Sequence, residues 1–96
     1  MTKAEIVTSI SEKLGVEKSD THEIVNHFMK EVRSALESGE NVYLRGFGSF
    51  VVKTRKAKKG RNISQNVTID IPAHNIPSFK PAKVFLEEVK TKVAVN

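Results

Sequence analysis

The apolar positions of the first forty residues recur every three or four residues, which is the period of an α-helix. Thr2 and Glu5 fit a capping box at the start of a first helix, and Gly15 fits its end. A second and longer apolar stripe ends before Gly39 and contains Ile24, Val25, Phe28, Met29, Val32 and Leu36. Two amphipathic helices joined by a few residues predict a helical hairpin over residues 1–40.

From Asn41 the apolar period falls to two, which is the period of a β-strand. A first short strand at residues 42–45 is followed by the turn sequence GFG and by a second strand that runs from Ser49 into a basic stretch. The alternating residues Val67, Ile69 and Ile71 predict a returning antiparallel strand. We expect Pro72 and Pro77 at its far end, where an edge strand or a bulge tolerates proline.

These patterns predict one α+β domain over residues 1–96. It consists of the helical hairpin (1–40), a three-stranded antiparallel sheet with a long protruding β-ribbon arm (41–80) and a short C-terminal helix (81–93), in which Pro81 fits the first helical position. The outer half of the ribbon has almost no large apolar residues, so we expect it to lie away from any core. The remaining body of roughly seventy residues is in the size range in which a small hydrophobic core often needs further stabilisation, such as oligomerisation. This favours a dimer. The predicted dimer core is Phe28, Val32, Phe47, Phe50, Phe79 and Phe85.

The net charge of +5 is concentrated in the middle of the chain. Residues 1–40 hold five basic and eight acidic side chains, whereas residues 41–83 hold nine basic residues and one acidic residue. Such an asymmetry indicates a polyanionic partner, either a nucleic acid or an anionic membrane surface.

Several function classes find no support in the residues. The chain has no cysteine, its start lacks the apolar region of a signal peptide, and no apolar run is long enough to span a bilayer, which favours a soluble intracellular protein. The three histidines have no zinc-ligand spacing, and we interpret His74 as a solvated turn residue. The sequence GFGSF is not a dinucleotide-binding G-x-G-x-x-G. We therefore expect no enzyme, no metal, no cofactor and no small-molecule substrate.

The basic residues of the arm have the spacing of a phosphate-binding strand. Lys53, Arg55, Lys59 and Arg61 share odd numbers and so fall on one face, with Lys56 and Lys58 on the other. Successive charges on one face are about 6.6 Å apart, close to the phosphate repeat of one nucleic-acid strand. Single-strand RNA platforms place aromatic side chains among their basic residues, and membrane-surface binding favours a basic amphipathic helix. Both features are missing from the arm, so we favour duplex DNA.

Ile63 is an isolated apolar residue in the turn that follows the basic stretch. It is either an incidental surface aliphatic, which needs no explanation, or a wedge. Proteins that kink DNA insert an apolar side chain between base pairs from the minor groove and gain a bend that wraps more protein. The residues alone leave both interpretations open.

Four motifs resemble the HU/IHF family of bacterial nucleoid proteins. They are GFGSF, R-x-A-x-x-G-R-N (residues 55–62), P-x-F-K-P-x-K (residues 77–83) and the opening TKAEI, and they are spread over nearly the whole chain. The resemblance implies an intertwined dimer with a helical base and a sheet saddle, either a homodimer or a heterodimer with a related chain. Its two β-ribbon arms would enter the minor groove of duplex DNA and bend it, largely through backbone contacts and shape readout. The wedge mechanism is general knowledge of such architectural proteins, and for this chain it is implied by the resemblance. The implied location is the bacterial cytoplasm, on the nucleoid.

Carried onto this chain, the resemblance implies a specific set of DNA contacts. Those of the arm are Lys53, Arg55, Lys56, Lys58, Lys59, Arg61, Asn62 and Ile63. Those of the body are Lys3, Arg45, Gly46, Gly48, Ser49, Lys80 and Lys83, several of them at helix N-termini or in the GFGS turn.

The tip of the arm departs from the family pattern. The family usually has R-N-P-x-T-G there, and this chain has RNISQN, so Ile63 stands in place of the intercalating proline. Gln65 and Asn66 replace the threonine and the glycine. Isoleucine is apolar enough to act as a wedge, but it lacks the rigid ring of proline and keeps its N–H. Ala82 in place of the usual glycine is a minor change.

Overall fold

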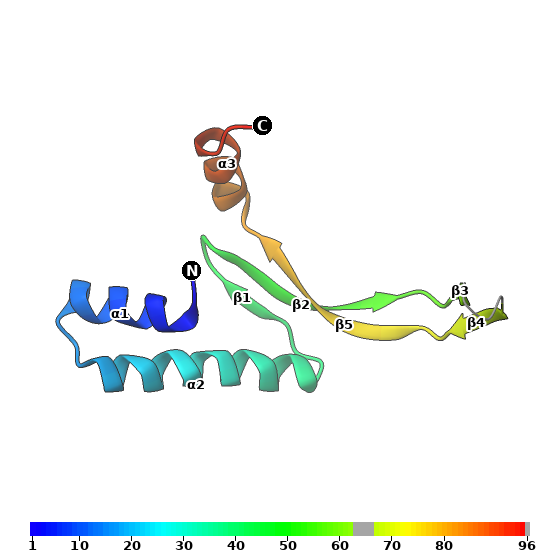
Figure 1. The fold of residues 1–96 in the computed structure, drawn as a ribbon, viewed down its shortest axis with the longest axis horizontal. Helices are drawn as coiled ribbons and strands as arrows, with labels where there is room; N and C mark the ends of the chain where they lie inside the picture. Colours follow the sequence, from blue (N-terminus) through cyan, green and yellow to red (C-terminus); the bar gives the residue numbers. More distant parts are fainter. Residues whose placement is uncertain (63–66, 96) are drawn as a thin grey trace.

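The computed structural model describes residues 1–62 and 67–95 and begins with two helices that lie side by side in opposite directions (Figure 1). α1 spans Lys3–Leu14 and α2 spans Lys18–Glu37. Thr2 Oγ1 accepts a hydrogen bond of 3.3 Å from the Glu5 N–H, and Gly15 ends α1 with a φ of +68°. The helical hairpin and the ends of its first helix are therefore confirmed.

A three-stranded antiparallel sheet follows, in the order β1-β2-β5. Its strands are β1 (Val42–Leu44), β2 (Gly48–Arg55) and β5 (His74–Pro81). α2 packs against β1 and β2. Val42 and Leu44 are half-buried and Tyr43 between them is exposed, so the first two face the helix and Tyr43 lies on the outer face of the sheet.

An arm prolongs the β2–β5 hairpin and projects away from the body (Figure 1). Its strands are β3 (Lys58–Asn62) and β4 (Val67–Ile71). The last pair of the sheet is Arg55 with His74, and the first pair of the arm is Lys58 with Ile71. Two residues on each strand separate these pairs, so the register is continuous and contains no bulge. Pro72, which has no N–H to donate, lies in this gap.

Residues 74–81 form a strand that the sequence pattern did not predict. Pro77 lies inside β5 opposite Val52, so its predicted place at the far end of the returning strand is wrong, although it does lie on an edge strand as expected. The Val52 N–H points the other way and donates a hydrogen bond of 3.0 Å to Asn41 Oδ1. Since Pro77 lies on an edge strand at a pair that exchanges no hydrogen bonds, the sheet tolerates it.

α3 (Lys83–Lys92) stands apart from the rest of the protomer (Figure 1). Pro81 is the last residue of β5, so the predicted helix start is wrong by two residues. The Ala82 N–H donates a hydrogen bond of 2.9 Å to the Phe47 carbonyl oxygen, which ties the start of α3 to the turn between β1 and β2.

The protomer has almost no interior of its own. Among the described residues Val7 is the one hydrophobic side chain that is fully buried. The chain exposes 8363 Å², whereas a compact monomer of its mass exposes about 5,500 Å². Its radius of gyration is 18.9 Å, against about 12.5 Å for a compact chain of this length. The sheet and helices of one protomer therefore support the arm but do not enclose a hydrophobic core. No helix in the described part of the chain is long and apolar enough to cross a bilayer.

Candidate nucleic-acid interface

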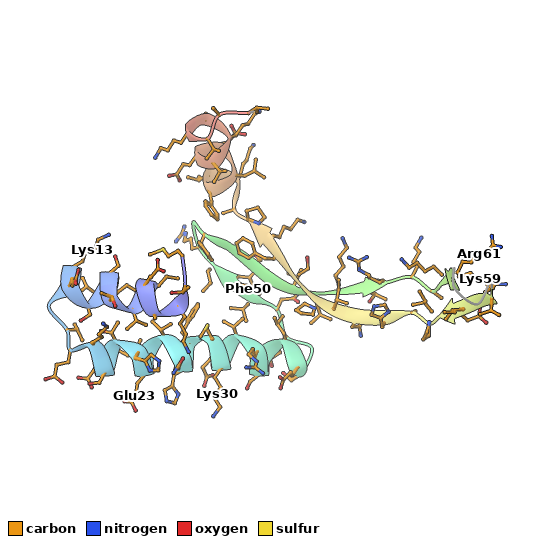
Figure 2. The ribbon with its side chains drawn as sticks, in the orientation of Figure 1. Lys13, Glu23, Lys30, Phe50, Lys59 and Arg61 are labelled. Carbon is orange, nitrogen blue, oxygen red and sulfur yellow. The ribbon has the colours of Figure 1, made fainter. Side chains whose placement is uncertain are left out.

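Exposed cations line the arm and its base. They are Lys53 and Arg55 on β2, Lys56 in the gap, and Lys58, Lys59 and Arg61 on β3. Figure 2 shows Lys59 and Arg61 near the outer end of the arm, far from both N-terminal helices. Lys59 pairs across the ribbon with Asp70, the single acidic residue between positions 41 and 83. The arm is therefore a strongly positive surface held away from the acidic helices.

A groove of about 280 Å³ at the base of the arm gathers cations from both predicted faces. It is lined by Lys53, Thr54, Arg55, Lys56, Lys58 and His74. Lys53 and Arg55 belong to one predicted face of the ribbon, and Lys56 and Lys58 belong to the other. The carboxylates of residues 1–62 and 67–95 make no ion pair with these cations, so the groove favours an anion.

His74 is exposed, as predicted, but it is the first residue of β5 and lines this groove, so its interpretation as a turn residue is wrong. Its Nδ1 lies 3.0 Å from the Pro72 carbonyl oxygen. It stands directly opposite Arg55 in the sheet. This position could not be recognised from the residue pattern, because the strand that begins at His74 was not predicted.

Gly46 and Gly48 are both required by the backbone, for different reasons. The Phe47 N–H donates a hydrogen bond of 3.0 Å to the carbonyl oxygen three residues earlier, and Gly46 inside this turn has a φ of +80°. Gly48 is buried, and a Cβ on it would lie 2.6 Å from the Lys80 carbonyl oxygen and 2.7 Å from the Phe79 ring. The turn is therefore held close against β5.

The remaining predicted contact cations are exposed on the body. They are Arg45 in the turn between β1 and β2, Lys80 on β5, and Lys83 and Lys3 as the first residues of α3 and α1. The sheet register places Lys80 directly beside Ser49. Lys3 Nζ donates a hydrogen bond of 2.9 Å to Asn26 Oδ1, a neutral acceptor that leaves its charge uncompensated. The structure thus gathers Arg45, Ser49, Lys80 and Lys83 around the GFG turn and leaves Lys3 on the helical side.

Four of the predicted dimer-core residues form one aromatic cluster at the top of the sheet. The Phe47 ring centroid lies 5.2 Å from that of Phe79 and 5.4 Å from that of Phe85, and Phe79 lies 5.0 Å from Phe50. Such contacts stabilise beyond their buried area. The cluster is still incompletely covered, since Phe47 is 46% and Phe79 is 39% exposed.

The other two predicted core residues lie on α2, apart from this cluster. Phe28 is 48% exposed and Val32, one turn further along, is half-buried. Ile24 and Met29 are exposed beside them. In Figure 2, Glu23 and Lys30 project from the side of α2 turned away from the sheet, so the polar residues of this helix have a separate face.

The tip of the arm is only partly described. Ile63 lies outside the described residues, as does the side chain of Asn62, whose backbone pairs with Val67. The expectation that the outer ribbon has almost no large apolar residues is wrong, because β4 carries an aliphatic line. Val67 and Ile69 are exposed, and the Ile71 side chain would lie 3.2 Å from a Cβ on Gly60.

Within residues 1–62 and 67–95, no group of three or more histidine, aspartate or glutamate side chains is placed to hold a metal ion.

Comparison with known proteins identifies relatives of this arrangement. A family model described as "Bacterial DNA-binding protein" matches residues 1–90. The SPbeta prophage-derived DNA-binding protein HU 2 of Bacillus subtilis (strain 168) is 44% identical over 92 residues, covering 96% of this chain and 100% of the relative. The integration host factor subunit alpha of Pseudoalteromonas translucida (strain TAC 125) is 40% identical over 96 residues, covering 100% of this chain and 93% of the relative.

Solved structures give the same answer for the fold. A chain of the Anabaena HU-DNA cocrystal structure superposes with a TM-score of 0.88 at 38% identity, covering 93% of this chain and 97% of that chain. HU from Thermotoga maritima superposes with a TM-score of 0.65 at 28% identity, covering 93% and 98%. The predicted α+β fold and the predicted resemblance are both confirmed, and the chain belongs to the HU/IHF family of bacterial DNA-binding proteins.

Proposed function

We propose that two copies of this chain, or one copy and a related chain, form an architectural protein that binds duplex DNA and bends it. Each arm follows the minor groove, and the body supports the DNA between the arms. Most contacts go to the phosphate backbone, so binding depends on groove shape and deformability more than on base sequence. The proposed contacts on the arm are Lys53, Arg55, Lys56, Lys58, Lys59, Arg61, Asn62 and Ile63, and those on the body are Lys3, Arg45, Gly46, Gly48, Ser49, Lys80 and Lys83.

The observation that carries the proposal is the construction of the arm. A single unbroken register runs from Gly48 opposite Pro81 to Asn62 opposite Val67, and cations follow it along most of its length. The ten residues from Lys53 to Asn62 extend it by about 30 Å, which exceeds the depth of either groove of DNA. An arm this long and this positive can follow a duplex around its side.

Entry into the minor groove connects binding with bending. The minor groove of B-DNA is about 6 Å wide, while the two backbones of a β-ribbon alone are about 4.8 Å apart before side chains are counted. A ribbon therefore fits only a widened minor groove, and a bend away from the arm widens it. DNA that bends easily should accordingly bind better.

Ile63 is proposed as the wedge that opens one base step at each end of the bend. Its place in the sequence supports this role, because it directly follows Asn62, the last paired residue of β3. An aliphatic side chain inserted into a base step loses stacking energy and keeps the kink open.

The proposed dimer follows from the surface that one protomer leaves uncovered. The chain exposes about 2,900 Å² more than a compact monomer of its mass, which is enough for an obligate interface even after the arm is allowed for. The exposed parts of the phenylalanine cluster, the Phe28 patch and the apolar residues of α3 would meet their counterparts there. α3 in particular packs on the rest of its own protomer mainly through Phe85.

The proposed location is the bacterial cytoplasm, on the nucleoid, and the proposed role is non-enzymatic. Both rest on membership of the HU/IHF family, which acts on DNA as an architectural and not a catalytic component.

Fluorescence anisotropy of a labelled duplex tests the proposal. We expect the protein to bind duplex DNA. A minor-groove ligand should displace the protein, and bulky substituents in the major groove should leave its affinity unchanged. Equal affinity for duplex RNA and single strands, or displacement by major-groove substituents alone, would contradict the proposed mode. Sedimentation of the purified chain with and without DNA gives the number of protomers in the complex.

A further inference from the structure

An exposed tyrosine lies on the outer sheet face, at the centre of the edge strand β1. Tyr43 is the single tyrosine of the chain, there is no tryptophan, and the residue is 71% exposed. It pairs with Ser49 on β2, and Ser49 pairs with Lys80 on β5. Paired residues of antiparallel strands point to the same face, so the three side chains form one row about 10 Å long across the sheet.

A backbone donor fixes the orientation of the neighbouring amide. The Val52 N–H donates a hydrogen bond of 3.0 Å to the side chain of Asn41, so the atom facing it must be Oδ1. Asn41 Nδ2 is thereby turned toward Tyr43, and it lies 3.3 Å from Tyr43 Oη. An amide nitrogen only donates, so the tyrosine hydroxyl accepts in this contact.

The hydroxyl proton of Tyr43 is therefore left to point elsewhere. No residue in the described part of the chain accepts a hydrogen bond from it. An exposed hydroxyl whose acceptor side is occupied and whose donor side faces outward is suited to a ligand that only accepts. Phosphate oxygens are such acceptors, and tyrosine is one of the neutral residues that bind them in protein–DNA interfaces.

We propose that Tyr43 Oη donates a hydrogen bond to a DNA phosphate that lies across the outer sheet face, and that Asn41 orients it for this contact. The inference rests on the proposed function, because it needs DNA on this face. Ser49 and Lys80, in the same row, provide the other donors to this strand. The row thus combines two neutral hydroxyl donors with one cation.

The variant Tyr43→Phe tests the contact because it removes the hydroxyl and keeps the ring. We expect the dissociation constant for duplex DNA to rise roughly tenfold to a hundredfold, because each dimer loses two hydrogen bonds, one per protomer. The slope of log affinity against log salt should stay unchanged, since no cation is lost. Lys80→Ala is the matched control in the same row and should lower both the affinity and the slope. Wild-type affinity in Tyr43→Phe would overturn the proposal.

A double-mutant cycle separates a positioning role of Asn41 from a structural one. Asn41→Ala should weaken DNA binding in the wild type and have little further effect in the Tyr43→Phe background, because Asn41 acts through the hydroxyl. Equal effects in both backgrounds would mean that Asn41 only supports β2, and the orienting role would be wrong. The thermal midpoints of the four variants show whether folding contributes.

The fluorescence of Tyr43 gives a test without substitution, since it is the only strong emitter in the chain. Duplex binding should protect it from acrylamide quenching. If anisotropy shows no duplex binding at all, the proposed function fails. If the duplex binds while quenching of Tyr43 is unchanged, this inference alone fails.

Discussion

The Phe79 ring closes so tightly over Gly48 that a Cβ on the glycine would lie 2.7 Å from two ring carbons. The Lys80 carbonyl oxygen would lie closer still, at 2.6 Å, and the backbone cannot yield as a flexible side chain can. The contact joins the turn that is proposed to hold phosphates with the aromatic cluster that is proposed to hold the dimer together.

Gly48→Ala should therefore destabilise the protein. We expect a loss of about 1–3 kcal/mol in the free energy of unfolding, as for overpacking of a tight site. Urea denaturation measures it. Gly60→Ala is the matched control, because its nearest neighbour at 3.2 Å is the end of the Ile71 side chain, which can move. An equal effect of the two substitutions would show that the Phe79 contact is not the cause.

Phe28→Glu should prevent formation of the dimer. The side chain is 48% exposed in the protomer, and the proposed interface covers it. A buried, unpaired carboxylate costs several kcal/mol, which exceeds what a marginal domain can lose. Sedimentation and circular dichroism should show dissociation with loss of helix. Lys30→Glu, on the side of α2 turned away from the sheet, should remain a dimer (Figure 2). A folded Phe28→Glu dimer would place the interface elsewhere.

Lys59→Ala should change the salt dependence of DNA binding. Each dimer loses two arm cations, so the magnitude of the slope of log affinity against log salt should fall by about 2. Anisotropy titrations over a range of salt concentrations measure the slope. Lys13→Ala provides the control, because Lys13 lies on α1, far from the arm (Figure 2). An unchanged slope for Lys59→Ala would remove the outer arm from the interface.

Ile63→Ala should reduce the bend angle more than it reduces affinity, because a wedge acts on the kink while phosphate contacts supply most of the binding energy. Ile63→Pro, which restores the family residue, should keep the bend. Ile69→Ala removes an equal aliphatic volume from β4 and should leave the bend angle close to that of the wild type. Bend angles come from energy transfer across the duplex. Parallel losses of bend and affinity in Ile63→Ala would make Ile63 an ordinary contact residue.

The helices were predictable because their signals are local. The Thr2 cap, the Gly15 stop and the apolar stripe of α2 depend on residues within a few positions of one another. β5 was not predictable in the same way, since Pro72 and Pro77 are typical of a strand end. Pro77 fits a strand only because β5 is an edge strand and Val52 donates to Asn41 instead, which is a fact of tertiary structure.

The residues of the candidate site also divide into those that the sequence alone predicts and those that only the tertiary structure reveals. Basic arm residues such as Lys59 and Arg61 can be recognised in the sequence, because a cluster of positive charge is visible without knowledge of the tertiary contacts. Tyr43 does not stand out, since an outward aromatic in an alternating strand is ordinary. Its proposed role follows from two tertiary facts: the register places it beside Ser49, and Asn41 donates a hydrogen bond to its hydroxyl.

Energy transfer between dyes at the two ends of a short duplex tests the central claim most directly. We predict that the wild-type protein raises the transfer as it saturates the duplex and that added salt reverses the rise, because several phosphates are neutralised per dimer. Saturated binding, confirmed by anisotropy on the same sample, with no change in transfer would contradict the claim that this protein bends DNA.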